Sequence, residues 1–401
     1  MATITYQEMK LSPQVWMLGA LMGAFIAAAA WAVWFVEHHG HIVTGMNNQT
    51  VWGLPHVFAI FLIVAASGAL NVASIASVFG KTAYKPMARL SGLMAIALLA
   101  GGLAVLVLDL GRPDRILVAM TEYNFVSIFS WNIYLYTGFF AIVGAYLYVQ
   151  MARGVSPKTI RILGTVAFVW RLALTTGTGS IFGWLVARTA YDAAIMAPLF
   201  IAMSFSFGLA TFILVTKLLC AITGREFGPL LLKRMGNLLA VFAAAVLYFT
   251  TVQHLSNLYV AEHTVVETFI LRTGGMITML FWVAQVALGG LIPILLLFHP
   301  RLNKIPANTL IASLLIILGG FAQLYVIVVG GQAVPLDIFP GYEASSSFFD
   351  GAINSYTPTM VEWLLGLGGI ALALALTGFG AVALRILPST LSDVQTASGS
   401  T

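Results

Sequence analysis

The chain has 401 residues, of which 60% are hydrophobic and only 8% are charged; 19 basic and 14 acidic side chains give a formal net charge of +5. Soluble domains carry about 25% charged residues, so this composition excludes a soluble globular protein, a disordered chain and a nucleic-acid-binding protein. The single cysteine, Cys220, excludes a disulfide framework, a cysteine-ligated zinc site and an iron–sulfur cluster within this chain. The sequence therefore predicts an integral membrane protein.

Apolar runs long enough to cross a bilayer recur along the chain, since a helix needs about 20 mostly apolar residues to span about 30 Å of hydrocarbon. The runs are continuous rather than alternating, which is typical of helices and not of membrane strands. The polar and small residues from Thr175 to Ser180 predict that the fifth helix ends early. Ten transmembrane helices are expected, at residues 13–36, 55–79, 88–108, 127–151, 160–180, 194–220, 233–257, 274–299, 306–330 and 360–386.

The distribution of charge predicts how these helices are oriented. With the N-terminus in the cytoplasm and alternating loops, 14 of the 19 basic residues fall on the inner side, but only 3 of the 14 acidic residues do. Lys and Arg are enriched in cytoplasmic loops of membrane proteins. We therefore expect a multi-pass protein of a bacterial inner membrane with both termini in the cytoplasm.

A faint internal repeat predicts two four-helix bundles, at about residues 55–180 and 194–330, flanked by the first and last helices. The alternative is a chance match, because Trp and Pro are common at the ends of membrane helices. Residues 1–387 would form the membrane domain, with an outer loop at 331–359, and residues 388–401 a disordered cytoplasmic tail. The repeat pairs residues near the outer ends of helices: Pro55 with Pro198, Asp109 with His254, and Trp131 with Trp282.

Three polar residues fall at a similar outer depth and predict a ligand site. His56 begins the second helix, Asp109 ends the third and Asn132 begins the fourth. A neutral imidazole can exchange a hydrogen bond or a proton with a quinone or quinol, and a nearby carboxylate can pass the proton on. An aromatic wall of Phe58, Phe129, Trp131 and Tyr134 would suit a flat ring. The predicted quinone-binding site consists of His56, Asp109, Trp131, Asn132 and Tyr134.

Each of these polar residues also has a purely structural interpretation. His56 could anchor the helix at the lipid headgroups. Asp109 could pair with Arg112 or Arg115 and tie down a loop. Asn132 could form a hydrogen bond between helices, as polar side chains often do in membrane bundles.

Deeper polar residues predict a hydrated proton path. The alternative for its hydroxyl groups is packing of small residues whose side chains hydrogen-bond back to backbone carbonyls. Arg171 is harder to explain in this way, because a guanidinium inside a membrane needs a partner or water. The residues of the predicted path are Ser67, Asn71, Arg171, Thr175, Thr176 and His254.

Histidine positions argue against a haem group in this chain. Bis-histidine ligation needs two His at matching depth, and only His56 and His254 could pair in this way. Cytochromes b usually place their ligands mid-span. The cluster of His38, His39 and His41 is interpreted as a solvated loop rather than a metal site, so neither a haem nor a metal is expected.

Three sequence motifs resemble the NrfD/PsrC family, the membrane subunits of polysulfide reductase-like respiratory complexes. They are Trp-Gly-Leu-Pro-His at residues 52–56, Leu-Asp-Leu-Gly-Arg-Pro at 108–113 and Phe-Ser-Trp-Asn at 129–132. The similarity runs over most of the chain and is densest over residues 50–150. Within the family, the ten spans and the sequence of residues 109–139 look most like the DsrP group of the Dsr sulfur-metabolism complex.

The resemblance implies a subunit that has no redox centre of its own and reacts with menaquinone or ubiquinone. It would exchange electrons with a periplasmic iron–sulfur subunit, beside further membrane and cytochrome subunits. His56 stands where the polysulfide reductase subunit has a quinone-contacting His. Asn132 stands where a membrane subunit of alternative complex III carries an Asp on its proposed proton route, so the titrating group is absent here. A quinone-contacting Tyr of the family has no clear match in this sequence, and the polar stretch from Thr175 to Thr178 is the candidate for its place.

Two other functions remain open on the sequence alone. A secondary transporter with a site at the membrane midplane would suit parallel repeats and Gly-interrupted helices, although the polar groups gather at one face instead. A passive membrane anchor for redox partners would bind no ligand. The quinone type, the direction of electron flow, the sulfur substrate and proton pumping are not determined by the sequence.

Overall fold

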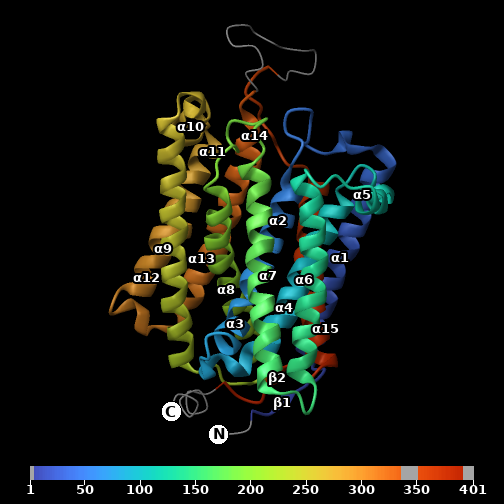
Figure 1. Cartoon of the computed structure of the whole chain (residues 1–401), viewed down its shortest axis with the longest axis vertical. Coiled ribbons are helices and arrows are strands. Elements are labelled where there is room, and N and C mark those ends of the chain that lie inside the picture. The colour runs from blue at the N-terminus through green and yellow to red at the C-terminus, as the bar shows by residue number, and fades with distance from the viewer. Residues whose placement is uncertain (1–3, 336–350, 392–401) are drawn as a thin grey trace.

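The computed structural model describes residues 4–335 and 351–391. Within these ranges, ten helical segments are long and apolar enough to cross a membrane. They confirm the predicted all-α integral membrane fold, and Figure 1 shows them running side by side along the long axis of the molecule. The ten segments are Pro13–His39, Leu54–Ser77, Thr82–Leu108, Ile128–Met151, Pro157–Gly183, Met196–Thr223, Pro229–Tyr259, Met276–Phe298, Pro306–Ala333 and Met360–Ala383.

Several of these segments consist of more than one element. The first seven spans contain α1 (Pro13–His39), α2 (Leu54–Ala69), α3 (Asn71–Ser77), η2 (Thr82–Met87), α4 (Ala88–Leu108), α6 (Ile128–Met151), α7 (Pro157–Gly183), α8 (Met196–Thr223) and α9 (Pro229–Tyr259). The last three contain α11 (Met276–Met279), η6 (Leu280–Leu291), α12 (Ile292–Phe298), α13 (Pro306–Tyr325), η8 (Val326–Gly330), α14 (Gly331–Ala333) and α15 (Met360–Ala383). Short helices in the connections are η1 (His41–Val43), η3 (Pro113–Arg115), α5 (Ile116–Thr121), η4 (Ala261–His263), α10 (Thr264–Thr268), η5 (Phe269–Thr273) and η7 (Leu302–Lys304).

The helices pack as two neighbouring sets of four. In the first set α2 contacts α4, α4 contacts α6, and α6 contacts α7, which returns to α2. In the second set α8 contacts α9, and the η6–α12 segment contacts both α9 and α13, which returns to α8. The two sets meet through α2, α7, α8 and α13, while α1 and α15 pack together beside α2 and α4. The division into two bundles as separate units remains a prediction.

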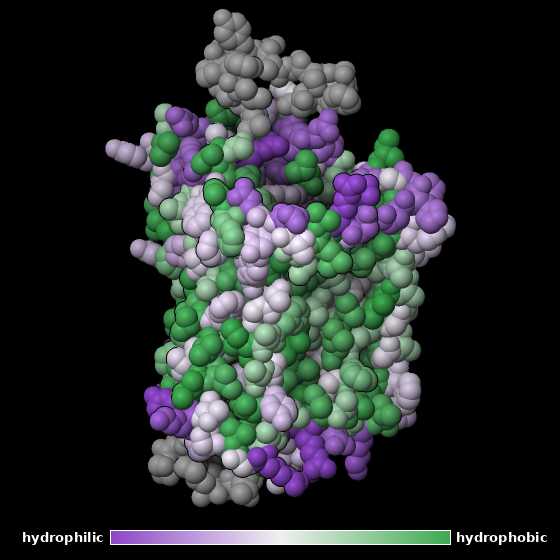
Figure 2. All heavy atoms as spheres, turned by 45° about the vertical axis from the view of Figure 1, so that its right-hand side comes forward, coloured by the Kyte–Doolittle hydropathy of each residue, from purple (hydrophilic) through white to green (hydrophobic). Residues whose placement is uncertain are grey.

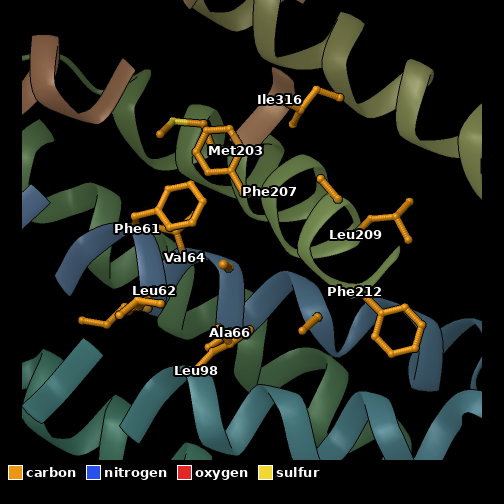
Figure 3. Packing of buried hydrophobic residues seen from close by; sticks show 14 of the residues in the cluster. Phe61, Leu62, Val64, Ala66, Leu98, Met203, Phe207, Leu209, Phe212 and Ile316 are labelled. Carbon is orange, nitrogen blue, oxygen red and sulfur yellow. The ribbon is translucent and has the colours of Figure 1, made fainter. Parts of the chain in front are cut away.

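The second span, α2 and α3, lies at the centre of the molecule. Of the 18 residues in its most apolar stretch, 89% are buried, compared with 11% in the corresponding stretch of α1 at the periphery. Phe61 of α2 stacks on Phe207 of α8 with ring centroids 5.5 Å apart, and Figure 3 shows these rings among aliphatic side chains from both helices. The residues at the two ends of α2 are therefore held by neighbours on several sides.

Two glycines allow α2 and α8 to cross at backbone contact. A Cβ atom at Gly68 would lie 1.6 Å from the carbonyl oxygen of Ser204, and one at Gly208 would lie 2.1 Å from the carbonyl carbon of Gly68. Small residues at helix crossings bring backbones together and increase dispersion contacts, which stabilise helix pairs in a bilayer. This crossing joins the two sets of helices.

The expectation that the fifth span ends early is wrong, because α7 continues without interruption to Gly183. Thr175 and Thr178 donate hydrogen bonds back to the carbonyls of Arg171 and Leu174, at 2.8 and 3.0 Å. These bonds hide the hydroxyl groups within the helix. Gly179 brings α7 close to α8, since a Cβ atom there would lie 2.8 Å from the carbonyl oxygen of Met196.

The segments near the two chain ends pair at one end of the molecule. Strand β1 (Tyr6–Gln7) is antiparallel to β2 (Leu387–Pro388), with Tyr6 opposite Pro388 and Gln7 opposite Leu387. Leu391 forms a bridge with Phe227. Of the tail predicted from residue 388, Pro388 and Leu391 thus take part in backbone pairing, and residues 392–401 lie outside the described residues. Residues 336–350 of the predicted outer loop also lie outside them.

The molecular surface carries an apolar belt between two hydrophilic ends, as Figure 2 shows for one face. Large apolar side chains in this belt are exposed on several peripheral helices, among them Trp16 of α1, Val169 of α7 and Leu318 of α13. Their exposure matches a lipid environment. The end that the charge pattern places outside the cytoplasm carries α5, α10 and α14, and it is called the outer end below.

We expect Gly68→Ala to destabilise the fold by about 1–3 kcal/mol, because the new methyl group would push the backbones of α2 and α8 apart. The measurement is the thermal unfolding midpoint of the detergent-purified protein, followed by tryptophan fluorescence. Gly144→Ala in α6 is the matched control, because a Cβ atom at Gly144 meets no atom within 4 Å. Equal midpoints for the two variants would contradict direct backbone contact at Gly68.

Candidate functional site

The outer ends of α2 and α4 bring a histidine and an aspartate together. His56 lies in the first turn of α2, after Pro55, and Asp109 follows the last residue of α4. His56 Nδ1 lies 2.9 Å from Asp109 Oδ2, and the two side chains are only 14% and 3% exposed. The two atoms are not aligned for a hydrogen bond, and neither has another hydrogen-bond partner among the described residues. The pair thus leaves polar atoms available at a mostly buried position.

The alternative interpretation, in which Asp109 pairs with Arg112 or Arg115 and holds a loop in place, is wrong. Arg112 instead forms a two-pronged ion pair with Asp114, with its Nε and Nη2 atoms 3.0 and 2.9 Å from the carboxylate oxygens. This pair is exposed to solvent, and the hydrogen bond from Arg112 lowers the pKa of Asp114. Asp109 therefore faces His56 without a competing guanidinium.

The aromatic wall beside His56 is built around Trp52. The indole ring stacks over the imidazole of His56 with centroids 6.2 Å apart and an interplanar angle of 28°. It also stacks on Tyr191 at 6.1 Å and meets the edges of Phe129 and Phe182 at 6.1 and 5.8 Å. Trp52 thus connects α2 with α6 and α7 by apolar contacts.

Trp131 and Tyr134, which the sequence assigned to this wall, lie on the exposed side of α6 instead. Their exposed fractions are 52% and 42%. Trp131 donates from Nε1 to the carbonyl of Phe125 at 2.7 Å, and the Tyr134 ring contacts Tyr123 at 5.1 Å. Residues three apart share one face of a helix, so this face points away from the one that carries the buried Asn132.

Asn132 forms hydrogen bonds between α6 and α7. Its Nδ2 atom donates to the carbonyls of Ile128 at 2.9 Å and Gly177 at 3.1 Å, and its Oδ1 accepts from Thr178 at 3.4 Å. These contacts correspond to the structural interpretation of Asn132, in which it forms a hydrogen bond between helices. No described hydrogen bond joins Asn132 to His56, although Phe129, one turn earlier on α6, contacts Trp52.

Gln332, which the sequence analysis missed, holds the backbone of Trp52. Its Oε1 accepts hydrogen bonds from the N–H groups of Val51 and Trp52, at 3.0 and 3.1 Å, and its Nε2 donates to the Trp52 carbonyl at 3.0 Å. Gln332 is only 1% exposed. It is 280 residues away in the sequence, so no local pattern could have linked it to the site.

A buried carboxylate on α15 anchors the start of α2. Glu362 is 1% exposed and forms a capping box with Thr359. It accepts a hydrogen bond from Tyr356 Oη at 2.5 Å, while Tyr356 Oη accepts one from the N–H of Leu54 at 2.7 Å. Burial, together with the hydrogen bond to Glu362, raises the pKa of Tyr356, which keeps the phenol protonated as a donor. Glu362 also accepts from the N–H of Gly45 at 2.9 Å.

Tyr356→Phe is expected to destabilise the protein by about 1–3 kcal/mol, because it leaves Glu362 and the N–H of Leu54 each without one partner. Thermal unfolding in detergent measures the change. Tyr259→Phe is the control, since Tyr259 is 92% exposed at the end of α9. If both variants unfold at the wild-type temperature, the hydrogen bonds of Tyr356 do not hold the start of α2.

Four residues of the predicted proton path gather between α2, α3, α7 and α8: Ser67, Asn71, Arg171 and Thr175. Thr175 Oγ1 donates to Ser67 Oγ at 2.6 Å, and Ser67 Oγ donates to the carbonyl of Arg171 at 3.1 Å. Asn71 Nδ2 lies 3.5 Å from the carbonyl of Phe205 on α8. Thr176, the next residue on α7, is half-buried. The hydroxyl of Ser67 therefore crosses to another helix, whereas Thr175 also bonds back within its own helix.

Arg171 is the largest fully buried side chain described, with 1% exposure. Its guanidinium lies 4.8 Å from the ring centres of both Phe168 and Phe205, an arrangement that stabilises a cation. Its Nη1 donates to the carbonyl of Ser67 at 3.3 Å, while Nε has no hydrogen-bond partner. Among the described residues, no carboxylate forms an ion pair with it.

His254 lies apart from this cluster, in the second set of helices. Its Nδ1 is 2.7 Å from Oε2 of Glu267 on α10, and Phe281 of η6 packs edge-on against its ring at 4.7 Å. The sequence analysis missed Glu267, because it lies in a connection between two spans and not in an apolar run. Only the return of that connection over α9 makes it a partner of His254.

The fold and the site define a multi-pass membrane protein with polar groups concentrated at the outer ends of its central helices. The model of the family described as "Polysulphide reductase, NrfD" matches residues 42–335. The chain belongs to this family, as the motifs around His56, Asp109 and Asn132 suggested.

Several similar proteins match over most of their own length. The Hdr-like menaquinol oxidoreductase integral membrane subunit of Archaeoglobus fulgidus is 28% identical, covering 94% of the present sequence and 95% of that protein. A putative membrane subunit of the dimethyl sulfoxide reductase of Halobacterium salinarum is also 28% identical, covering 90% and 88%. One polypeptide of the polysulfide reductase of Wolinella succinogenes is 22% identical, covering 71% and 95%.

Proposed function

We propose that this chain is the quinone-reactive membrane subunit of a multi-subunit respiratory oxidoreductase. The observation that carries the proposal is the buried pair of His56 and Asp109 beside the ring of Trp52. The relatives support it, since they belong to oxidoreductases and one is named for menaquinol. The quinone would be menaquinone or ubiquinone.

The residues present fit a quinol headgroup. His56 Nδ1 and Asp109 Oδ2 lack a well-aligned hydrogen bond, and a quinol hydroxyl could donate to either. Trp52 offers a flat apolar surface next to them. Oxidation of a quinol releases two electrons and two protons; a neutral His56 would accept one proton and the carboxylate of Asp109 the other, and both would pass to water at the outer end. Asn132 would not contact the headgroup and would contribute only by joining α6 to α7 through hydrogen bonds.

Electrons would leave to a partner, because the single Cys220 cannot by itself ligate an iron–sulfur cluster, and no group of three or more His, Cys, Asp or Glu side chains could hold a metal ion among the described residues. We propose a periplasmic iron–sulfur subunit at the outer end, with further membrane and cytochrome subunits, in an inner-membrane complex of dissimilatory sulfur metabolism. The position of the quinone site at the outer end supports a partner on that side. The cluster of Ser67, Asn71, Arg171, Thr175 and Thr176 would serve as a proton path.

His56→Ala and Asp109→Asn are each expected to weaken the binding of a fluorescent quinol-analogue inhibitor by tenfold or more, since about 1.4 kcal/mol of lost interaction corresponds to a factor of ten. Titration of the purified protein, followed by fluorescence quenching, measures the dissociation constant. His39→Ala is the control, because His39 is exposed and stacks on Phe35 at the end of α1.

Saturable binding that is unchanged in both variants would refute the site at the outer end of α2. Absence of saturable binding to the wild type, with or without partner subunits, would refute the function itself. Uptake of a solute into vesicles that contain the purified protein would then favour the secondary transporter over the passive anchor.

The proposed orientation is testable with introduced cysteines in a Cys220→Ser background. Glu122→Cys, between α5 and α6, should react with a membrane-impermeant thiol reagent in spheroplasts. Lys158→Cys, at the start of α7, should react only after permeabilisation, because the charge pattern places it in the cytoplasm. Both positions are exposed. The reverse labelling pattern would mean that both termini lie outside.

A further inference from the structure

A second buried histidine–carboxylate pair lies at the outer end of the second set of helices. Glu267 is only 1% exposed, and its two oxygens are held separately: Oε2 lies 2.7 Å from His254 Nδ1, and Oε1 accepts from Asn257 Nδ2 at 2.9 Å. Burying a carboxylate is costly unless it is paired or protonated. Glu267 has both options, because a proton can reside on it or on His254.

His254 of this pair borders the first of two small cavities among α8, α9, η6 and α13. Each has a volume of about 10 Å³, roughly the space that one water molecule requires. The first is bordered by His254 and Gln253, and the second by Thr250 and Ser206. Gln285 and Gln323 line both cavities. The space suits water and is far too small for a quinone ring.

An unpartnered acceptor points to water in these cavities. Gln285 is 6% exposed, and its Oε1 has no hydrogen-bond partner among the described residues. Leaving a buried acceptor unsatisfied is unfavourable, and a water molecule in either cavity would satisfy it. Gln285 lies in η6, a twelve-residue π-helix, a rare geometry that often marks functional sites. Across the cavities, Gln323 Nε2 donates to Thr250 Oγ1 at 3.0 Å.

We propose that His254 and Glu267 form a proton-binding site, reached from the outer end and connected inward by water beside Gln285 and Gln323. One proton is shared by the pair, arrives from outer water, and leaves to the water in the first cavity. No electron transfer and no covalent bond other than O–H and N–H is involved. The site does not depend on a quinone at His56.

The surroundings of the pair contain few other titratable groups. Apart from His254, none of the residues that line the first cavity from α8, α9, η5, η6, α13 and η8 is titratable. On the connection that carries Glu267, His263 is buried with Nδ1 unpartnered, whereas Glu262 and Arg272 are exposed. His263 is therefore the one further group described there whose titration could affect the pair.

Infrared spectroscopy of the purified full-length protein in lipid tests the proposal. As the pH is lowered, the wild type should gain the carbonyl band of a buried protonated carboxyl group. Glu267→Gln should lose that band, and Glu262→Gln should retain it, because Glu262 faces solvent. Replacing His254 by Gln should shift the pH midpoint of the band, which gives a second readout if Glu267→Gln does not fold.

The inward connection has its own measurement, the stretching bands of internal water in the same infrared spectra. Gln285→Leu should remove these bands, because an apolar side chain would expel the water from both cavities. A carbonyl band that persists at full amplitude in Glu267→Gln, or that titrates at the same pH in His254→Gln, would overturn the proton site. Unchanged bands of internal water in Gln285→Leu would overturn the water connection.

Discussion

The backbone contact of α2 and α8 at Gly68 and Gly208 is the constraint on which the rest of the structure depends. A bilayer provides no hydrophobic driving force between helices, so close packing must hold them together. The crossing places α2 at the centre, where its outer end receives side chains from α4, α6, α7 and α15. Ser67 is therefore fully buried among other helices and His56 is mostly buried, and a polar group is tolerated at each position.

Each of the two sets of helices contains a histidine–carboxylate pair, but the surroundings of the two pairs differ. In the first set, His56 faces Asp109 next to an indole ring, and its side chain keeps 14% exposure. In the second, His254 is 11% exposed and faces Glu267 beside a cavity of about the size of one water molecule. We propose a quinone headgroup as the ligand of the first pair and a proton as the ligand of the second. The resemblance between the two sets is thus chemical.

Hydropathy was sufficient to predict the ten helices and their bounds to within a few residues, because the cost of burying polar groups in lipid is large. The shared depth of His56 and Asp109 also followed from sequence, since both lie at the outer ends of adjacent spans. The direction in which Trp131 and Tyr134 point did not follow from the sequence, because it depends on how α6 is rotated about its axis.

Contacts between residues far apart in the chain could likewise not be predicted from sequence patterns. Gln332 and Glu362 show why: each holds the segment before α2 from a position about 280–320 residues further along the chain. A glutamine near the end of an apolar run and a glutamate in the first turn of a helix are ordinary residues for their places, and their role depends on which loop packs against them.

Arg171 makes the two possible proton routes unequal. Its charge is stabilised by the rings of Phe168 and Phe205 and by a carbonyl, and no described carboxylate pairs with it. A hydronium ion about 5 Å from this guanidinium would be opposed by about 3 kcal/mol at an effective dielectric constant of roughly 20. A proton that passes through the cluster around Ser67, whether on water or along hydroxyl groups, would meet this repulsion. No arginine or lysine is among the residues that line the two cavities beside Gln285, so a proton on the proposed route there would not border a guanidinium.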